Sequence, residues 1–257
     1  MSTIPPLLTV THADDVTRIV LNRADKGNAL SVELVFALTS ALTEAVESAL
    51  RTPPRLLVLS GAGKHFCTGF DLSSLDTETD DSLLARFTRV ELLLQSLHNA
   101  PFDTLALAHG RTMGAGADLF VACRHRWIVG DASFAFPGAA FGLVLGTSRL
   151  AEAAGAARAS EWVQSGATID ANAALAAGLA QRQLDPQDLD EGISVLSKRT
   201  RRLDLPTYLA VHSAVDSERR PWGSAGDAAD LLRLVQSAAR PGIRDRIAAY
   251  RNASSKR

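Results

Sequence analysis

Two glycine-containing turns decide the fold of this chain: His65-Phe-Cys-Thr-Gly-Phe-Asp-Leu72 and His109-Gly-Arg-Thr-Met-Gly-Ala-Gly116. Each turn follows a short apolar run, residues 55–61 and 104–109, of the kind that forms a buried strand. Glycine at such a position lets the backbone turn sharply and approach a ligand closely. The sequence therefore predicts the same arrangement twice, a strand that ends in a glycine turn with its backbone N–H groups presented.

The remaining pattern places strands and helices around these turns. Residues 8–11 and 16–21 predict an opening hairpin. Apolar residues recur every four positions from Leu34 to Leu50 and predict an amphipathic helix that ends before two prolines. A second helix is expected over 82–98, and after about residue 150 the strand signal gives way to helices. Alternation of strands and helices indicates an α/β fold.

Composition narrows the classes of partner. The 257 residues contain 27 Lys and Arg against 28 Asp and Glu, a net charge of −1, so no basic excess predicts nucleic-acid binding. The apolar share of 46% and the charged share of 21% are ordinary for a globular protein. No run is long and apolar enough to predict a membrane span, and the first six residues do not resemble a signal peptide. With two cysteines 56 positions apart, we expect a cytoplasmic protein without disulfides.

Several short motifs are incomplete. Gly61-Ala-Gly-Lys64 lacks two residues of a phosphate loop, because Val58 and His65 stand where glycine and a hydroxyl residue are needed. Gly114-Ala-Gly116 lacks the third glycine of a dinucleotide fingerprint, since Leu119 occupies that position. The six histidines and two cysteines form no HExxH or CxxC motif. We therefore expect no metal site.

Together with Leu21-Asn-Arg-Ala-Asp-Lys-Gly-Asn-Ala-Leu30, the two turns resemble the enoyl-CoA hydratase/isomerase, or crotonase, family. The resemblance continues through residues 131–137, 141–143 and 166–179, and spans roughly residues 8 to 182 in order. It implies a crotonase-like spiral of β-β-α turns over residues 1–190 and a C-terminal helical region, 191–257, that builds homotrimers or hexamers. It also implies an acyl-CoA thioester substrate, with no cofactor other than the CoA that the substrate carries.

The chemistry that the resemblance implies is stabilisation of a thioester enolate by two backbone N–H groups. These are carried over to Phe70, after Gly69, and to Ala115, after Gly114. Preorganised donors suit a developing oxyanion, and losing one typically costs ~3–4 kcal/mol of activation free energy. Ala115 departs from the glycine usual in the family, so a methyl group is expected at the border of the oxyanion hole.

The residues expected to move the proton depart from the family. Two glutamates flank the thioester in family hydratases, and here the matching positions are Asp118 and Gly138. Asp118 lies three residues beyond Ala115, on the same face if the segment is helical, which suits a general acid or base. Gly138 has no side chain, which weakens both standard hydration and standard isomerisation. Gly146 stands where a dehalogenase branch places its aspartate nucleophile, so that route is unsupported.

Contacts with CoA are carried over in the same way. Lys64 is a candidate for a phosphate, and backbone contacts are expected to dominate elsewhere. His65 and His109 are individually weak candidates, and Arg124 suggests a changed internal ion pair, because the family usually has aspartate there. The expected substrate-binding and CoA-binding residues are Lys26, Asn28, Ala29, Lys64, Phe66, Thr68, Gly69, Asp71, Leu72, Gly114 and Gly138.

The sequence thus predicts a divergent enoyl-CoA hydratase/isomerase-like enzyme that acts through an enolate held in an oxyanion hole. Two alternatives remain open. One is a malonyl-type acyl-CoA decarboxylase, or a hydrolase of a C–C bond or thioester, in the same family, for which Gly138 would make room. The other is a non-catalytic acyl-CoA-binding paralogue that keeps the scaffold.

Overall fold

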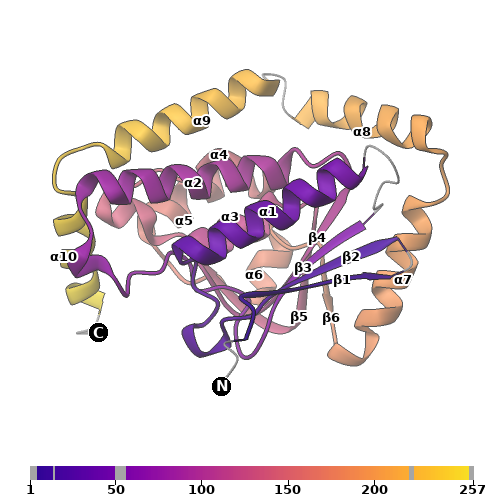
Figure 1. Cartoon of the computed structure of the whole chain (residues 1–257), viewed down its shortest axis with the longest axis horizontal. Helices are drawn as coiled ribbons and strands as arrows, with labels where there is room; N and C mark the ends of the chain where they lie inside the picture. The colour runs from indigo at the N-terminus through magenta and orange to yellow at the C-terminus, as the bar shows by residue number, and fades with distance from the viewer. Residues whose placement is uncertain (1–4, 14, 50–55, 220–222, 255–257) are drawn as a thin grey trace.

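The computed structural model describes residues 5–13, 15–49, 56–219 and 223–254. In these ranges six strands form one sheet in sequence order, β1-β2-β3-β4-β5-β6 (Figure 1). Strands β1 and β2 are antiparallel, and every later neighbouring pair is parallel. The bounds are Leu8–Ala13 (β1), Val16–Leu21 (β2), Leu56–Gly61 (β3), Asp103–Met113 (β4), His125–Ala135 (β5) and Arg182–Leu184 (β6). The predicted α/β class and opening hairpin are confirmed.

Helices connect the parallel strands. Each of the first three connections contains one long or medium α-helix: α1 (Val32–Ala49), α2 (Asp80–His98) and α3 (Ala115–Ala122). Short 3-10 turns precede α1 and α2, at η1 (Ala24–Lys26) and η2 (Leu75–Thr77). The predicted helices over 34–50 and 82–98 correspond to α1 and α2, although Leu50 and the two prolines after it lie outside the described residues.

Isolated bridges stack the successive connections on one another. Leu30 pairs with Phe70, Cys67 with Thr112, and Phe134 with Ile169, all outside the paired strands of the sheet or at their ends. The first two pairings join the segments after β2 and β3, and the segment after β3 to the end of β4, while the third joins the end of β5 to the segment before α6, so the chain advances as a spiral. This is the crotonase-like β-β-α spiral that the resemblance implied, and it brings the two glycine turns side by side.

The remaining helices follow β5. They are η3 (Pro137–Phe141), α4 (Thr147–Ala154), α5 (Ala156–Ser165), α6 (Ala171–Ala176), η4 (Pro186–Asp188), α7 (Leu189–Thr200), α8 (Leu205–Arg219), α9 (Gly223–Ala238) and α10 (Ile243–Ser254). The expected division between residues 190 and 191 falls inside α7, which packs Ile193 and Leu196 against the sheet beside Trp127. The assignment of 191–257 as a separate assembling region remains a prediction.

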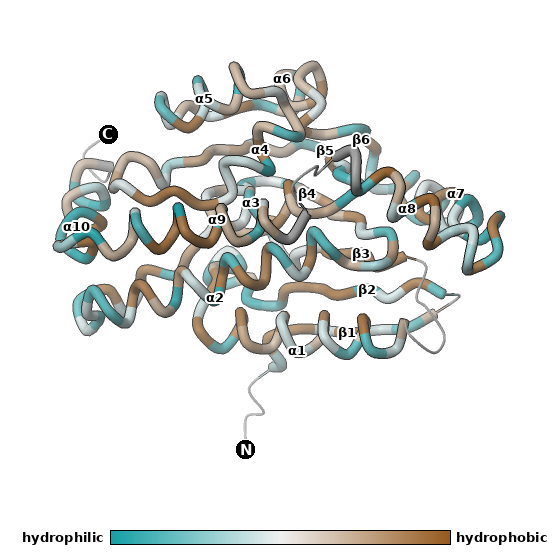
Figure 2. The backbone as a smooth tube through the Cα atoms, turned by 90° about the horizontal axis from the view of Figure 1, so that it is seen from above, coloured by the Kyte–Doolittle hydropathy of each residue, from teal (hydrophilic) through white to brown (hydrophobic). Residues whose placement is uncertain are grey.

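Helices α9 and α10 return to the N-terminal half of the chain. Figure 2 shows α9, α2 and α1 side by side. Leu234 of α9 and Ile243 of α10 share a buried cluster with Phe87 of α2 and Leu143, which follows η3. The Asp80 carboxylate at the start of α2 accepts hydrogen bonds from the backbone N–H groups of Gly242 and Arg244, at 2.6 and 3.1 Å. The C-terminal helices therefore cover the same region of their own chain that contains the glycine turns.

Two local features differ from the sequence-based expectation. The strand predicted over residues 104–109 was expected to end at His109. The corresponding strand β4 continues to Met113 through a register shift between Ala108 and Gly110. Gly110 has a φ of +55° and forms a bulge, so the sharp turn lies at Gly114 instead. Strand β5 was not predicted, because its apolar run is short and Gly130-Asp131 interrupts it.

Candidate active site

The two glycine turns meet at the positions expected for the oxyanion hole. Gly69 has a φ of +96°, and a Cβ built on it would lie 2.6 Å from the carbonyl oxygen of Met113 and 3.5 Å from the amide nitrogen of Ala115. The Met113 N–H donates to the carbonyl of Cys67 at 3.0 Å. Only glycine allows this contact between the turns. The amides of Phe70 and Ala115 are therefore presented by two segments that touch.

The N–H groups of Phe70 and Ala115 are the two candidate donors of the oxyanion hole. Among the residues that the structure describes, the N–H groups of Phe70 and Ala115 donate to no protein acceptor, although the neighbouring amides of Asp71 and Gly114 donate to Leu30 and Ala135. Ala115 is also the first residue of α3, where the helix dipole adds positive potential. Two free donors in fixed backbone can hold an oxyanion.

The Phe70 ring packs against two consecutive residues of α2. The Arg86 guanidinium lies 4.2 Å from the centroid of the ring, and Phe87 stacks on it at 4.3 Å. Arg86 also donates to the carbonyl of Asp71 at 2.9 Å and pairs with Glu78. Sequence reasoning missed Arg86, although a single arginine among the apolar positions Leu83, Phe87 and Val90 of a helix is a detectable signal. Arg86 fixes the segment that carries the first donor.

Asp71 belongs to the structural frame of the same turn. Its carboxylate pairs with Arg23 at 2.9 Å and accepts a hydrogen bond from the Ser73 N–H at 2.9 Å. Burial alone would raise the pKa of Asp71, but the hydrogen bonds from Ser73 and Arg23 outweigh burial and hold it below its usual value. Arg23 also donates to the carbonyl of Ala29, which ties the segment before α1 to this turn.

Several residues expected to contact CoA have side chains that bind or pack against other parts of the protein. Asn28 is fully buried, accepts from the Arg23 N–H at 2.8 Å, and donates to the carbonyls of Ala62 and His65 at 2.9 and 2.8 Å. Phe66 is fully buried in the aromatic core against Phe120. Any contact that Asn28 or Phe66 makes with a ligand must therefore come from the backbone.

The other expected contact residues line the same segments. Thr68 donates its amide and hydroxyl to the carbonyl of Gly27, and Leu72 packs against the cluster beneath α9 and α10. Lys26 and Lys64 are exposed, on the turn before α1 and on the turn after β3. Among these residues, the two lysines offer side-chain charge for a phosphate. Their role remains a prediction.

Asp118 lies in the first turn of α3 and is buried. Its Oδ1 atom has no hydrogen-bond partner among the described residues. Burial raises the pKa of Asp118 well above its usual value, while Arg149 lowers it and Glu91 raises it. Asp118 is therefore a carboxylic acid whose neutral form is favoured, one helical turn from the second oxyanion donor.

The two glycines that replace family carboxylates have different surroundings. A Cβ on Gly138 would meet only Leu143, with its carbonyl oxygen at 3.4 Å, so this position has room for a side chain. Gly146 has a φ of +66°, and a Cβ there would overlap Oδ1 of Asp118 and lie 2.6 Å from its Cγ. Gly146 is therefore required by the carboxyl beside it, whereas Gly138 leaves space.

The two histidines considered in the sequence connect loops. Nε2 of His109 lies 3.1 Å from the carbonyl of Gly63, and Nδ1 of His65 accepts a hydrogen bond from the Arg111 N–H at 3.1 Å. Both contacts hold the turn after β3 against β4. These side chains therefore have structural roles on the described contacts.

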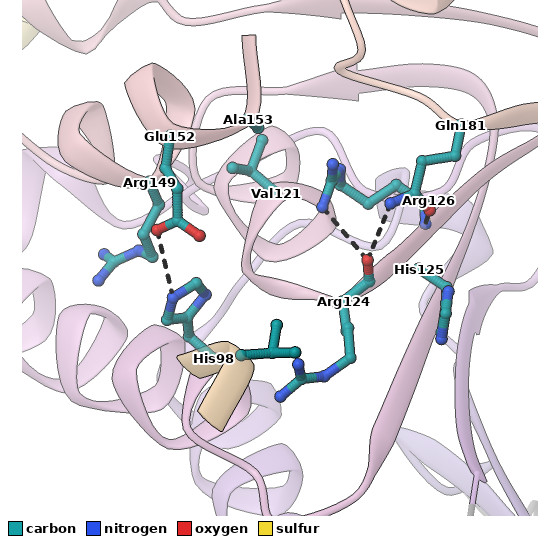
Figure 3. A pocket seen from close by; sticks show the side chains of 10 residues that line it. His98, Val121, Arg124, His125, Arg126, Arg149, Glu152, Ala153 and Gln181 are labelled. Atoms are coloured by element: carbon teal, nitrogen blue, oxygen red, sulfur yellow. Dashed lines mark hydrogen bonds and ion pairs between the residues drawn. The ribbon is translucent and has the colours of Figure 1, made fainter. Parts of the chain in front are cut away.

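A separate open pocket of about 360 Å³ lies where the C-terminal end of α3 meets α4, β5 and α8 (Figure 3). Its arginines and histidines already have partners. Arg149 pairs with Glu91, His98 with Glu152, and Arg124 with Asp216 of α8 at 3.0 Å. The changed ion pair expected at Arg124 is thus found. Arg126 donates to the carbonyls of Cys123 and Leu179. None of the expected site residues lines this pocket.

Within the described residues, no group of three or more histidine, cysteine or acidic side chains could hold a metal ion. In the same ranges, no helix is long and apolar enough to cross a membrane. Both cysteines are free and buried.

Comparison with known proteins agrees with the fold and with these turns. The family model described as enoyl-CoA hydratase/isomerase matches residues 16–252. The probable enoyl-CoA hydratase echA6 of Mycobacterium tuberculosis is 32% identical over 180 residues, which cover 68% of this chain and 70% of that protein. Ethylmalonyl-CoA decarboxylase of Mus musculus is 30% identical over 174 residues, 66% of this chain and 53% of that protein.

A crystal structure of an enoyl-CoA hydratase/isomerase family protein from Bordetella parapertussis superposes with a TM-score of 0.87 at 36% identity, covering 95% of this chain and 98% of that one. A spiral fold with paired glycine turns, matched over nearly its whole length, defines a crotonase-fold protein. The chain belongs to the enoyl-CoA hydratase/isomerase family.

Proposed function

We propose that this protein binds an acyl-CoA thioester, holds its enolate with the N–H groups of Phe70 and Ala115, and transfers one proton through Asp118. The leading reaction is hydration or double-bond isomerisation of an enoyl-CoA. The observation that carries the proposal is the buried Asp118, whose Oδ1 atom has no partner and which lies one helical turn from Ala115. An unpartnered buried carboxyl costs stability, so its retention beside two free N–H donors supports a role in proton transfer.

Charge and geometry support the division of roles. The thioester oxygen gains negative charge in the transition state, and the two fixed amides bind it without reorganisation. Asp118 lies one helical turn from Ala115, a spacing that suits a carboxyl that acts on the carbons next to that oxygen. Relatives carry acids at the positions that correspond to 118, 138 and 146. Because this chain has glycine at 138 and 146, Asp118 is the carboxyl available to this chemistry.

The test is an assay with crotonyl-CoA and a 3-enoyl-CoA, followed by absorbance of the conjugated thioester. Wild type is compared with Asp118→Asn, which keeps the shape of the side chain but cannot exchange a proton. We expect wild-type turnover and a loss of about 10²–10⁴-fold in kcat in the variant. CoA binding is measured in parallel by calorimetry. Tight binding with no turnover of any substrate would support the non-catalytic paralogue instead.

A second candidate reaction is decarboxylation of a malonyl-type acyl-CoA. Here the C–C bond to the carboxylate breaks, CO₂ leaves, the electron pair forms the enolate, and Asp118 donates its proton to the carbon. Two observations favour it: the neutral form of Asp118 is a donor, and Gly138 leaves space. The 30% identity to a mouse ethylmalonyl-CoA decarboxylase is a further reason to test it.

Gly138→Glu separates the two reactions. A glutamate there would repel a carboxylate-bearing substrate, so decarboxylation should fall sharply. Enoyl-CoA hydration should be retained or increased, because hydratases of the family carry glutamate at this position. Release of CO₂ from methylmalonyl-CoA and loss of crotonyl-CoA absorbance are the two measurements.

The expected homotrimer or hexamer is a proposal from the resemblance, and light scattering of the purified protein tests it.

A further inference from the structure

A buried ion pair lies behind Asp118. Glu91 of α2 and Arg149 of α4 form two parallel hydrogen bonds, Nη1 to Oε1 at 3.0 Å and Nη2 to Oε2 at 2.6 Å. The two side chains are 1% and 2% exposed. Gln95 donates to the same Glu91 at 2.8 Å. Such a bidentate pair uses both terminal nitrogens of the guanidinium and fixes its plane.

Arg149 is the one cation that acts on Asp118 among the described residues. Of the elements packed around Asp118, α2 contributes Glu91 and α4 contributes Arg149, and these are the charges that act on its carboxyl. Asp230 of α9 lies 3.8 Å from Nη1 of Arg149 and is itself paired with Arg233 at 2.8 Å. Three carboxyl groups therefore compete for a single buried guanidinium.

The hydrogen bonds show that Arg149 binds Glu91 and not Asp118. Glu91 takes both terminal nitrogens, whereas Oδ1 of Asp118 and Nε of Arg149 are both buried without a hydrogen-bond partner in the described chain. In a region of low dielectric, a cation that faced Asp118 directly would stabilise its ionised form strongly. Since both terminal nitrogens of that cation bind Glu91, Arg149 acts on Asp118 only through space, and burial still raises the pKa of Asp118.

We propose that Glu91 is a positioning residue: by binding both terminal nitrogens of Arg149 it prevents a hydrogen bond between Arg149 and Asp118, and thereby keeps the proton on the catalytic carboxyl. This rests on the proposed function, because it assigns Asp118 the proton-transfer role. Glu91 itself touches neither substrate nor the oxyanion donors. Its part is to fix the orientation of one charge.

The test is an infrared titration of the protein without substrate. The carbonyl stretch of protonated Asp118 is identified as the band that is lost in Asp118→Asn. In Glu91→Gln, which keeps the shape and removes the charge, we expect the titration midpoint of that band to fall by about 1–3 pH units, because Arg149 becomes available to Asp118. Asp230→Asn is the matched control, since it removes a carboxylate that lies 3.8 Å from Arg149 without a hydrogen bond to it, and it should leave the midpoint near that of wild type.

Two further variants keep the test decisive. Glu91→Asp retains the charge but withdraws it by one methylene, and should shift the midpoint in the same direction by less, even if Glu91→Gln does not fold. The double variant Glu91→Gln with Arg149→Met removes the cation as well and should return the midpoint to the wild-type range. Unchanged midpoints in both Glu91→Gln and Glu91→Asp would overturn the inference.

The outcome is distinguishable from failure of the proposed function. A midpoint that shifts in Glu91→Gln while Asp118→Asn leaves turnover intact would support the positioning role and reject Asp118 as the proton-transfer group. If turnover depends on Asp118 but the midpoint does not change in variants of Glu91, the proton-transfer role of Asp118 is supported and the positioning role of Glu91 is rejected. If Glu91 has the positioning role and Asp118 transfers the proton, variants of Glu91 should shift the pH at which kcat declines together with the infrared midpoint.

Discussion

Gly146 lies against Asp118 so closely that a Cβ on Gly146 would be 2.6 Å from Cγ of the aspartate. The φ of +66° at Gly146 also places it in the left-handed region that favours glycine. The position that carries a nucleophilic aspartate in a dehalogenase branch is therefore closed to any side chain in this protein. The carboxyl of Asp118 fits in this position because Gly146, which lies against it, has no side chain.

This contact predicts that substitutions at Gly146 and Gly138 differ in their effect on stability. Gly146→Ala should lower the free energy of unfolding by more than ~1 kcal/mol, because of strain at positive φ, and should reduce kcat by displacing Asp118. Gly138→Ala, whose Cβ meets Leu143 at ordinary contact distance, should change stability by less than ~0.5 kcal/mol. Urea unfolding and steady-state kinetics measure both. Equal effects at the two positions would contradict the assignment.

The buried Asp118 predicts a pH-dependent stability. Burial raises the folded-state pKa of Asp118 above the unfolded value of about 3.9, so the folded protein binds the proton more tightly than the unfolded chain. The contribution of the neutral acid is present in full below about pH 4 and is lost as pH rises toward the folded-state pKa. The free energy of unfolding should therefore fall with pH more steeply in wild type than in Asp118→Asn. Parallel curves for the two proteins from pH 4 upward would rule this out.

Arg86 should matter for turnover more than for binding. Arg86→Met removes the guanidinium above the Phe70 ring and the hydrogen bond to Asp71, so the first oxyanion donor loses its support. We expect kcat to fall by about 10–100-fold with a small change in KM, since a misplacement of ~1 Å can cost ~100-fold. Arg89→Met, on the exposed side of α2, is the control. Partial recovery is expected in Arg86→Lys, and a change confined to KM would argue against positioning.

Asp103 joins the sheet to α8 and should be important for stability. Its carboxylate lies 3.0 Å from Nε2 of His125 and 3.7 Å from Nε2 of His212, and it accepts from the Tyr208 hydroxyl at 3.3 Å. Burial alone would raise the pKa of Asp103, but the contacts with His125 and His212 outweigh burial and hold it well below its usual value. This contribution is present above about pH 4 and lost as pH falls further.

Asp103→Asn should therefore reduce the free energy of unfolding at neutral pH by about 3–5 kcal/mol, the cost of breaking a buried charge pair. Tyr208→Phe removes two hydrogen bonds, the one that the hydroxyl accepts from the Asp103 N–H at 2.8 Å and the one that it donates to the Asp103 carboxylate, and should cost about 1–3 kcal/mol. Denaturant unfolding at pH 7 and pH 3 measures both, and the deficit of Asp103→Asn should shrink at the lower pH. A deficit that is independent of pH would mean that the charge of Asp103 is not what holds α8.

Local pattern was enough to predict the alternation of strands and helices, the opening hairpin and the two glycine turns. Those features depend on residues close in sequence: the four-residue repeat of α1, the apolar run of β3, and the glycines that end it. The same locality explains the misses. Strand β5 has too short an apolar run to stand out, and the bulge at Gly110 depends on pairing with β5, which no local pattern encodes.

The resemblance of the sequence to the enoyl-CoA hydratase/isomerase family implied the spiral and the roles of Phe70 and Ala115, and the three-residue spacing of Ala115 and Asp118 placed these two on one helix face. Only the tertiary structure decided their environment. Arg86 reaches Phe70 from 16 positions along the chain, and Glu91 meets Arg149 from 58 positions away. The pKa of Asp118 depends on its burial and on the charges of Arg149 and Glu91, and these surroundings arise only when distant helices pack together.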